Sequence, residues 1–390
     1  MRRGGGPGGG ALLAAVLAAA LLPILAVPAR AEVSASVTLS AYGTVARYGD
    51  GAVAGAFLKS RLDLQSTGNE NVRGQLQLDG WVGDGLYVDI PRAWIRVRFP
   101  VLRLTAGRSR LSWGEGFVFN AGDVIFGSLD LLSGDLSAAA LRDETAWLTA
   151  LYVPLGPLSF LEAVVLPFGA PPSEAGGLSD TLAGLLNPLP LGELAGGAGL
   201  RGVFRLGGLK LEPGWYADWA EGEHRPYLSL QGHFLADWHL SAVLAVPLTE
   251  PEWSRAGDWL ALTGGLFHLT RLGGGRSLAL RLEAVMRPGA RWQAAEGDEA
   301  LPAGHPDAPV YGLALFPEAA VALSDTLSLQ LRALVSPVDL SALGLLAVSW
   351  NVYQGLRLFA NVAAMAGDGD DLYGWRQGGP ALTLGAEFIY

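Results

Sequence analysis

The feature that most constrains the fold of this chain is an alternation of apolar and polar residues with a period of two. Between residues 57 and 65, leucines at 58, 62 and 64 alternate with Lys59, Arg61 and Asp63. The same pattern recurs in 72–81, 95–99 and 327–332. A helix would instead place its apolar residues about three to four positions apart. These segments therefore predict β-strands that present one apolar face and one polar face.

The composition excludes both an ordinary soluble domain and a helical membrane protein. Charged residues make up 16% of the chain, whereas soluble domains carry about 25%. After residue 31, however, no run of about 18 uninterrupted apolar residues occurs, and a membrane-spanning helix needs such a run. A β-barrel accounts for both observations, because only alternate residues of its strands face lipid. We expect an all-β, antiparallel, up-and-down transmembrane barrel.

The connections between the predicted strands alternate between short turns and longer loops, as in transmembrane barrels. Short turns are predicted at 68–69, 100, 156–157, 207–208, 236–237, 273–275, 324–325 and 354–355. Longer connections fall near 110–143, 169–195, 220–224, 249–257, 288–308, 337–341 and 367–378. Placing one strand between each turn and the next loop gives about eighteen strands, or sixteen or fourteen if the weakly patterned segments 158–168 or 341–352 are not strands. An even number places both chain ends on the periplasmic side.

Both ends of the chain indicate export to a bacterial outer membrane. The N-terminus has two arginines, an apolar run over about residues 11–27 and the small residues Ala29 and Ala31. This is the pattern of a cleaved signal peptide over residues 1–31, with a retained membrane anchor as the alternative. The alternating last segment ends at Tyr390 and resembles the final strand of outer-membrane barrels, which the barrel-assembly machinery reads. We therefore expect a single barrel domain over residues 32–390.

A second resemblance lies in residues 107–120, which read Gly-Arg-Ser-Arg-Leu-Ser-Trp-Gly-Glu-Gly-Phe-Val-Phe-Asn. The stretch is similar to a Gly-Arg-x-Arg-x-x-Trp-Gly-x-Gly motif, followed by Asn-x-x-Asp, in bacterial outer-membrane porin-like β-barrel families. The resemblance implies a class of protein and not a solute. The segment opens the longest predicted connection, whose apolar and charged side chains suit either insertion into the lumen or packing on the rim. The candidate constriction residues are Trp113, Glu115, Asn120 and Asp123.

Arginines alternate with apolar residues along many predicted strands. An arginine on the lipid face would cost about 2–4 kcal/mol at mid-membrane, so these side chains must face the lumen or an interface. Rings of arginine favour anions in pores. The candidate solute contacts are Arg61, Arg73, Arg96, Arg98, Arg103, Arg108 and Arg110, of which Arg73, Arg96, Arg98 and Arg103 would form one basic stripe. The alternative is a lattice of ion pairs with inward acids at Asp63, Asp79, Glu212, Asp218, Glu283 and Glu387.

These observations predict an outer-membrane porin or substrate-biased channel for passive diffusion of small polar or anionic solutes. We expect no cofactor and no metal site, because the sequence has no nucleotide-binding glycine loop and no His-x-x-x-His pair. One rival is a closed structural or adhesive barrel without an open pore. The other is a barrel enzyme, against which the scattered histidines and the missing Gly-x-Ser-x-Gly motif argue. The expected partners are the lipid bilayer and small solutes, with a homo-oligomer left open. The net charge of −10 argues against nucleic acid.

Overall fold

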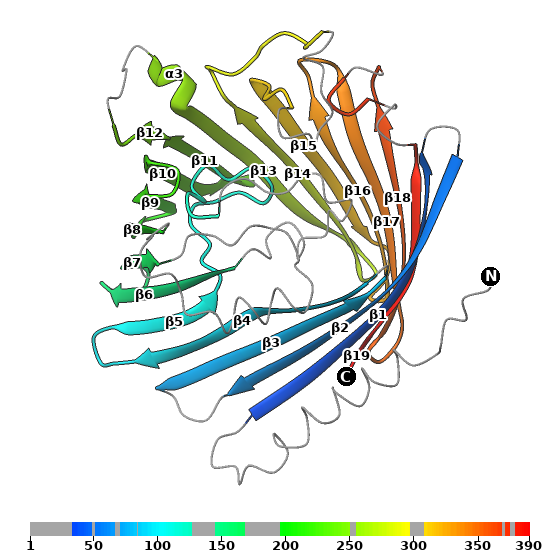
Figure 1. Cartoon of the computed structure of the whole chain (residues 1–390), viewed down its shortest axis with the longest axis horizontal. Helices are drawn as coiled ribbons and strands as arrows, with labels where there is room; N and C mark the ends of the chain where they lie inside the picture. Colours follow the sequence, from blue (N-terminus) through cyan, green and yellow to red (C-terminus); the bar gives the residue numbers. More distant parts are fainter. Residues whose placement is uncertain are drawn as a thin grey trace, which may run out of the picture.

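The strands of this protein form one continuous antiparallel sheet that closes on itself. In the computed structural model, β1 (Val33–Tyr48) pairs with β2 (Gly51–Ser66) on one side and with β19 (Ala381–Ile389) on the other. Figure 1 shows the resulting barrel, with β1 and β19 side by side. The predicted all-β antiparallel barrel is thus confirmed. The structure describes residues 33–48, 51–66, 71–83, 85–126, 145–167, 196–249, 255–296, 308–368, 371–374 and 379–390.

Each strand pairs with its neighbours in sequence, which is the up-and-down topology. The first half of the wall comprises β3 (Val72–Val82), β4 (Leu86–Arg98), β5 (Arg103–Ser109), β6 (Ala146–Pro154), β7 (Phe160–Leu166), β8 (Gly197–Leu206), β9 (Leu209–Asp218) and β10 (Glu223–Phe234). The second half comprises β11 (Ala236–Leu244), β12 (Val246–Pro247), β13 (Leu260–Gly273), β14 (Arg276–Met286), β15 (Leu313–Ala322), β16 (Leu327–Ser336), β17 (Ser341–Tyr353) and β18 (Leu356–Ala366).

The wall has eighteen strands. The two-residue β12 and the strand β11 both pair with β10, so β12 continues β11 beyond Ala245, and the nineteen labelled strands are eighteen crossings of the wall. The weakly patterned segments 158–168 and 341–352 are genuine strands, β7 and β17. The helix α3 (Ala256–Trp259) lies in the connection before β13. Among the residues that the structure describes, no helix is long and apolar enough to span a membrane.

Two predicted connections differ in detail from the structure. The turn expected at 236–237 centres on Leu235 instead, because Ala236 and Asp237 still pair with the opposite strand. The connection at 220–224 is short, because the Asp218 carboxylate accepts the backbone N–H groups of Ala220 and Glu221 at 3.1 Å each and closes a tight turn. The expected signal peptide, residues 1–31, lies outside the described residues, as does the predicted connection 169–195.

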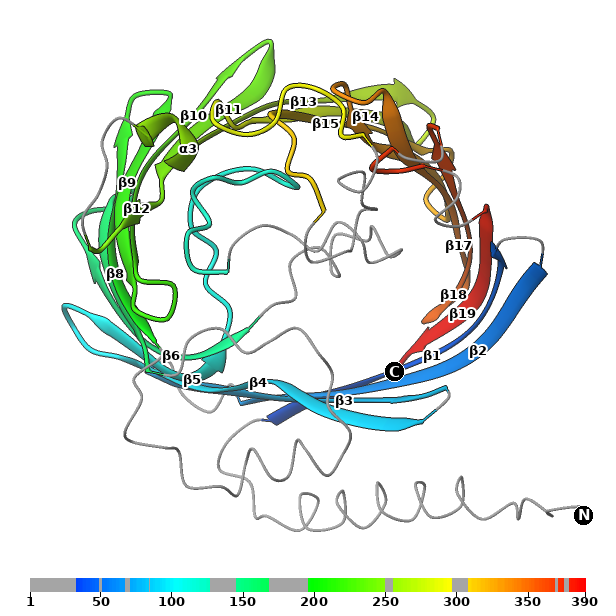
Figure 2. The ribbon, with the colours of Figure 1, turned by 45° about the horizontal axis from the view of Figure 1, so that its top comes forward.

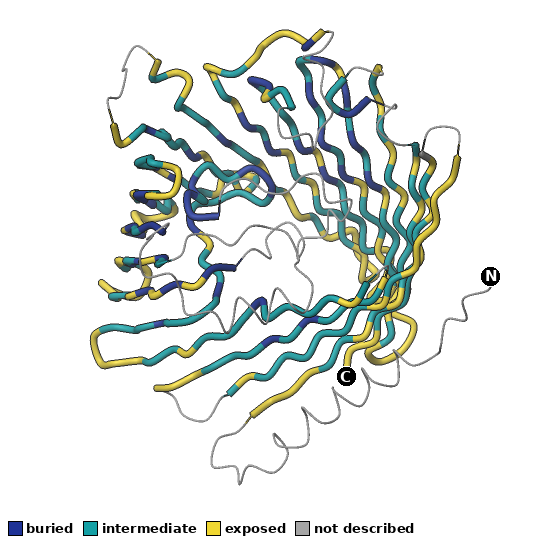
Figure 3. Tube along the Cα trace, in the orientation of Figure 1, coloured by how far each residue is buried: buried dark blue, intermediate teal, exposed yellow. Residues whose placement is uncertain are grey.

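The two faces of the wall differ as the alternation predicts. Outward leucines and isoleucines are widely exposed, for example Leu58 (59%), Ile95 (51%) and Leu331 (56%), which suits a surface in lipid. Their neighbours in sequence point inward and are polar or small. Figure 3 shows that buried residues are frequent in β15–β17 and in the segment that follows β5 inside the barrel. The packed core of this protein therefore lies within the barrel, between its wall and that segment.

Candidate functional site: the pore lumen

Residues 110–126, which we call the lumen segment, leave the end of β5 and run inside the barrel. Figure 2 shows this segment within the ring of strands, nearer to β8–β13 than to β2–β4. Its backbone and side chains contact inward-facing residues of β7, β9, β13 and β14. Of the two placements that the sequence leaves open, the described part of this connection adopts insertion into the lumen. Residues 127–144 of the same connection lie outside the described residues.

Two apolar patches of the wall hold the lumen segment. Trp113, which is fully buried, packs with Val124, Ile125 and Phe126 against buried residues of β6, β7, β9 and β10. Val118 and Phe119 pack against a second patch formed by Val285, Phe316, Leu334, Leu343, Leu345 and Tyr373. Burial, together with nearby Asp339, raises the pKa of Tyr373 to about 12, so its hydroxyl stays neutral. Burying an apolar side chain such as Val118 or Phe119 stabilises the folded state by about 1.5–3 kcal/mol.

Three inward glutamates fasten the segment by hydrogen bonds. Glu162 of β7 accepts the Nε1–H of Trp113 at 3.0 Å, and Glu212 of β9 accepts the backbone N–H of Gly114 at 2.6 Å. Glu283 of β14 accepts the backbone N–H groups of residues 117, 118 and 119 at 2.6, 2.7 and 2.9 Å. Three successive amides thus surround this carboxylate, and Arg281 lies 3.9 Å from it on the same strand. The three glutamates therefore attach the lumen segment to β7, β9 and β14.

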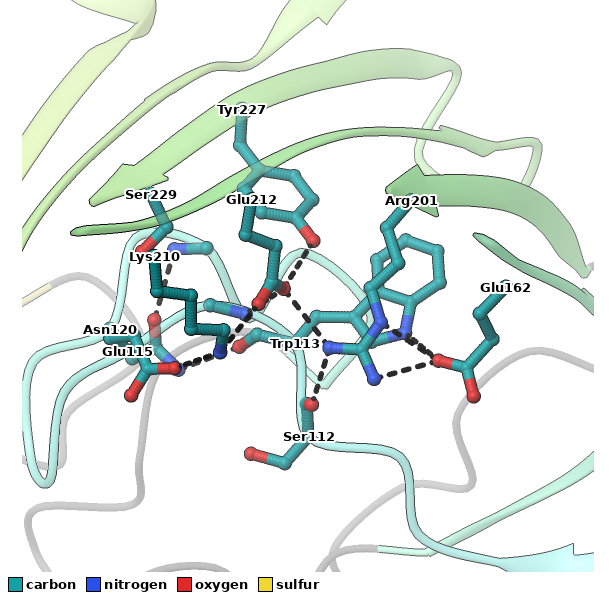
Figure 4. Close-up of polar contacts among 12 residues, drawn as sticks. Ser112, Trp113, Glu115, Asn120, Glu162, Arg201, Lys210, Glu212, Tyr227 and Ser229 are labelled. Atoms are coloured by element: carbon teal, nitrogen blue, oxygen red, sulfur yellow. Dashed lines mark hydrogen bonds and ion pairs between the residues drawn. The ribbon is translucent and has the colours of Figure 1, made fainter. Parts of the chain in front are cut away.

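Arg201 of β8 links two of these glutamates, as Figure 4 shows. Its guanidinium group lies 2.8 Å from Glu162 and 3.0 Å from Glu212, and it also donates to the backbone oxygen of Ser112 at 2.9 Å. The Tyr227 hydroxyl donates to Glu212 at 2.8 Å. Lys210 contacts Glu212 at 3.1 Å and also bonds Glu115. Buried charges are tolerated when they are paired and hydrogen-bonded in this way.

The glycines and Asn120 of the sequence motif close the segment on itself. Gly114 has a φ of +68°, and a Cβ there would lie 2.5 Å from both Asn120 Oδ1 and Gly122 Cα. Asn120 donates from Nδ2 to the backbone oxygen of Trp113 at 2.8 Å and accepts the N–H of Gly122 at 3.1 Å. Only glycine combines this backbone conformation with so close an approach. The motif thus specifies the shape of the lumen segment.

The predicted constriction residues all lie in this segment. Trp113 and Asn120 are structural, since their polar groups are used within the attachment. Glu115 is bound to Lys210. The backbone N–H of Asp123 donates to the backbone oxygen of Asn120 at 3.1 Å. The segment that carries these four residues narrows the barrel on the side of β8–β14.

Several inward arginines form ion pairs with acids of neighbouring strands. Arg61 lies 2.7 Å from Asp79, and Arg108 lies 2.9 Å from Asp89. The same holds for Arg332 with Glu318 at 2.9 Å and Arg357 with Glu387 at 2.8 Å. Arg110 begins the lumen segment, away from the predicted stripe. The predicted lattice of ion pairs therefore exists in the wall, and it includes two of the arginines proposed as solute contacts.

The four arginines of the basic stripe are arranged differently. Arg73 of β3 and Arg96 of β4 are register partners, and Arg98 of β4 and Arg103 of β5 are register partners in turn. Arg103 also pairs with Tyr152 of β6, on the same face as Leu148 and Ala150, which pack against the lumen segment. The stripe therefore faces the lumen.

In the described part of the chain, no acid is in direct contact with the stripe. None of the four guanidinium groups forms an ion pair there. Arg96 donates from Nε to the Thr105 hydroxyl at 3.0 Å and lies over the Trp94 ring at 4.8 Å. Arg103 lies over the Tyr152 ring at 4.0 Å. These neutral partners orient the guanidinium groups and leave their charge in place.

Three acids of these ion pairs, Asp89, Glu162 and Glu318, escape the sequence analysis. Glu162 and Glu318 are buried acids in the apolar runs of β7 and β15, where the alternation is weak. The signal that could have found them is their charge, because a glutamate in an apolar strand of a barrel cannot face lipid without cost. Between 33 and 390, within the described ranges, no group of three His, Cys, Asp or Glu residues is placed to hold a metal ion.

The sequence matches no established family model and no curated protein, whereas solved structures match its fold. OccK2 (OpdF) of Pseudomonas aeruginosa, solved in complex with glucuronate, has a TM-score of 0.59 at 14% identity, over 92% of this chain and 98% of that chain. OccAB4 of Acinetobacter baumannii has a TM-score of 0.58 at 11% identity, over 92% and 98%. The outer membrane protein OprD of P. aeruginosa has a TM-score of 0.53 at 13% identity, over 92% and 93%.

At these identities the likeness establishes the fold. The chain shares the closed barrel architecture of these proteins, so its resemblance to outer-membrane porin-like barrels is confirmed at that level. The comparisons assign no solute and no individual residue to this chain.

Proposed function

We propose that this protein is an outer-membrane channel for the passive diffusion of small organic anions. The observation that carries the proposal is the basic stripe Arg73, Arg96, Arg98 and Arg103, which faces the lumen without acidic partners among the described residues. A solute anion in the lumen would gain the bidentate contacts that these guanidinium groups do not make within the protein. The ion-paired arginines elsewhere in the wall contribute little net charge.

The lumen segment supplies the second part of the proposed mechanism. It is fastened to β7–β14 by Glu162, Glu212 and Glu283, and the stripe lies on β3–β5. Solutes would pass between the segment and the stripe, so that the segment limits their size and the stripe biases their charge. That OccK2, a protein of the same fold, was solved with glucuronate supports a small organic acid as the class of solute.

Location and assembly are part of the same proposal. The apolar outward face would lie in the outer membrane, and the last strand, ending beside Tyr390, would be read by the barrel-assembly machinery. Residues 1–31 would be removed on export, which N-terminal sequencing of the membrane-inserted protein tests directly. A mature protein that began at Met1 would contradict the signal-peptide assignment.

Solute flux into proteoliposomes tests the channel itself. The mature chain is refolded into vesicles, its folded state is checked by heat-modifiable gel mobility, and swelling is followed in isosmotic sugars and organic acids of increasing size. We expect swelling that falls with solute size and is faster for the organic anions than for neutral sugars of equal size. Folded protein that gives no swelling would instead indicate a closed structural barrel.

A further inference from the structure

The basic stripe contains two pairs of arginines that face each other across neighbouring strands. Arg73 is opposite Arg96, and Arg98 is opposite Arg103. Like charges placed directly opposite each other destabilise a sheet. Other like-charge pairs of the wall have an opposite charge in contact with them: Asp79 and Asp89 bind Arg61 and Arg108, Asp218 and Glu223 bind Arg225, and Lys210, which is opposite Arg205, binds Glu212. The stripe repeats the like-charge pairing without such a partner among the described residues, which points to a ligand that neutralises it.

The surroundings keep these charges available. Arg73 and Arg98 are exposed to the lumen, and Arg96 and Arg103 are half-buried. Arg96 uses its Nε on the Thr105 hydroxyl, which leaves the two terminal nitrogens of its guanidinium group directed elsewhere. The Trp94 and Tyr152 rings hold the planes of Arg96 and Arg103. An anion that entered the stripe would meet oriented donors that form no ion pair with a carboxylate among the described residues.

The charge of a facing pair matches a doubly charged anion. One monocarboxylate offers one negative charge and one bidentate edge, which satisfy a single guanidinium group. A phosphoryl group, or a dicarboxylate, offers two charges and oxygens on two sides. We infer that Arg73 with Arg96, and Arg98 with Arg103, form two successive binding positions for a dianionic solute. This inference rests on the proposed channel function and narrows its solute class to dianions.

The two positions are spaced for transfer along the pore. Arg96 and Arg98 are two residues apart on β4, and both point to the lumen, so the positions are about 7 Å apart along the strand. A dianion can therefore contact the second pair before it has left the first. Conduction requires binding that is distributed over several sites in this way.

Single-channel recording in chloride solution tests the inference. The refolded mature protein is exposed to inorganic phosphate, at a pH where it is mainly a dianion, to succinate, and to acetate as the monoanion. We expect phosphate, succinate or both to interrupt the chloride current at concentrations about tenfold lower than acetate, the ratio that one further charge-assisted contact is worth. Interruption by phosphate alone would identify a phosphoryl solute, and interruption by succinate alone a dicarboxylate.

Variants connect the effect to the pairs. Arg73→Gln and Arg98→Gln each break one pair and should each reduce the preference over acetate, and the double variant Arg73→Gln/Arg98→Gln should abolish it. The double variant Arg357→Gln/Glu387→Gln removes a neutral ion pair elsewhere in the wall and should retain it. Equal interruption by acetate and the dianions, in a channel that conducts, would overturn the inference and leave the proposed function intact.

A second measurement does not depend on conduction. A dianion bound to the folded state stabilises it by mass action, so phosphate or succinate should raise the unfolding midpoint of the wild-type barrel more than acetate does. The Arg73→Gln/Arg98→Gln variant should lose this difference. If folded protein conducts no ions, the proposed function fails, and this shift still decides whether the dianion positions exist. An equal midpoint in all three anions would contradict them.

Discussion

Glu283 of β14 accepts the backbone N–H of Val118 at 2.7 Å, although the two residues lie 165 positions apart in the chain. The same carboxylate accepts the N–H groups of residues 117 and 119. A single side chain of the wall therefore holds one turn of the lumen segment in place. The position of the lumen segment inside the barrel depends on that attachment.

Replacing Glu283 should release the lumen segment. Glu283→Ala leaves three amides without their acceptor, and we expect it to destabilise the segment by about 2–4 kcal/mol. Limited proteolysis of the folded barrel, with the cleavage sites mapped by mass spectrometry, should then show cuts within residues 110–126. The control Asp63→Ala removes a carboxylate that bonds Gln75 in the wall and does not contact the segment. Equal resistance of both variants would show that apolar packing alone holds the segment.

The glycine at position 114 should be required for the shape of the segment. Gly114→Ala adds a Cβ 2.5 Å from Asn120 Oδ1 in a backbone with a φ of +68°. The matched control is Gly207→Ala, with a φ of +62° and no neighbouring atom within 4 Å. The control should lose about 1–2 kcal/mol for its left-handed backbone, and Gly114→Ala should lose more. Urea unfolding measures the loss of free energy of unfolding in both variants. Equal losses would contradict the close approach of Asn120 to Gly114.

Two arginines of the wall should differ strongly in their contribution to stability. The Arg201 side chain is 12% exposed and joins Glu162 to Glu212. Arg201→Met leaves both acids without this partner, and we expect a loss of about 3–5 kcal/mol. The Arg357 side chain is 45% exposed beside Glu387, so Arg357→Met should cost about 0–1 kcal/mol. Similar losses in urea unfolding would refute the assignment of Arg201 as the link between the glutamates.

Two exposed leucines should be replaceable with a gain in stability. Leu235 and Leu340 have φ values of 61° and 60°, which a leucine adopts at a cost of about 1–2 kcal/mol. Asparagine tolerates this conformation better. Leu235→Asn and Leu340→Asn should therefore raise the unfolding midpoint. The control Leu206→Asn, at the exposed end of β8 and without a positive φ, should not. A lower midpoint in either test variant would show that its side chain makes stabilising contacts with the membrane.

The fold was largely predictable because a period of two survives in almost every strand. The alternation of Leu58 and Arg61 alone assigns the two faces of β2, and an even number of crossings makes the first and last strands antiparallel, as their pairing in the closed barrel requires. The exceptions are informative. β7 and β17 read as weak strands because their inward residues are apolar where they pack against the lumen segment or its surroundings. Where inward positions of these strands pack inside the barrel, they are apolar, so the alternation of apolar and polar residues is weak there.

The site was predictable only in part. The sequence identified the arginines of the stripe and the segment around Trp113, because their residue types are costly or unusual in a barrel wall. It could not separate Arg61 and Arg108, which are paired with Asp79 and Asp89, from arginines that remain unpaired. Cross-strand partners depend on register, which the alternation does not fix when turn lengths vary. Insertion of the segment likewise depends on contacts far apart in the chain.

The reversal potential of the refolded channel under a potassium chloride gradient tests the central claim most directly. We predict a sign that reports preference for chloride over potassium, because the stripe has no acidic partner among the described residues, whereas arginines such as Arg61, Arg108 and Arg332 are ion-paired. The variant in which Arg73, Arg96, Arg98 and Arg103 are all replaced by glutamine should lose that preference. A folded channel that prefers potassium, or one whose chloride preference is unchanged in the fourfold variant, would contradict the role of the stripe.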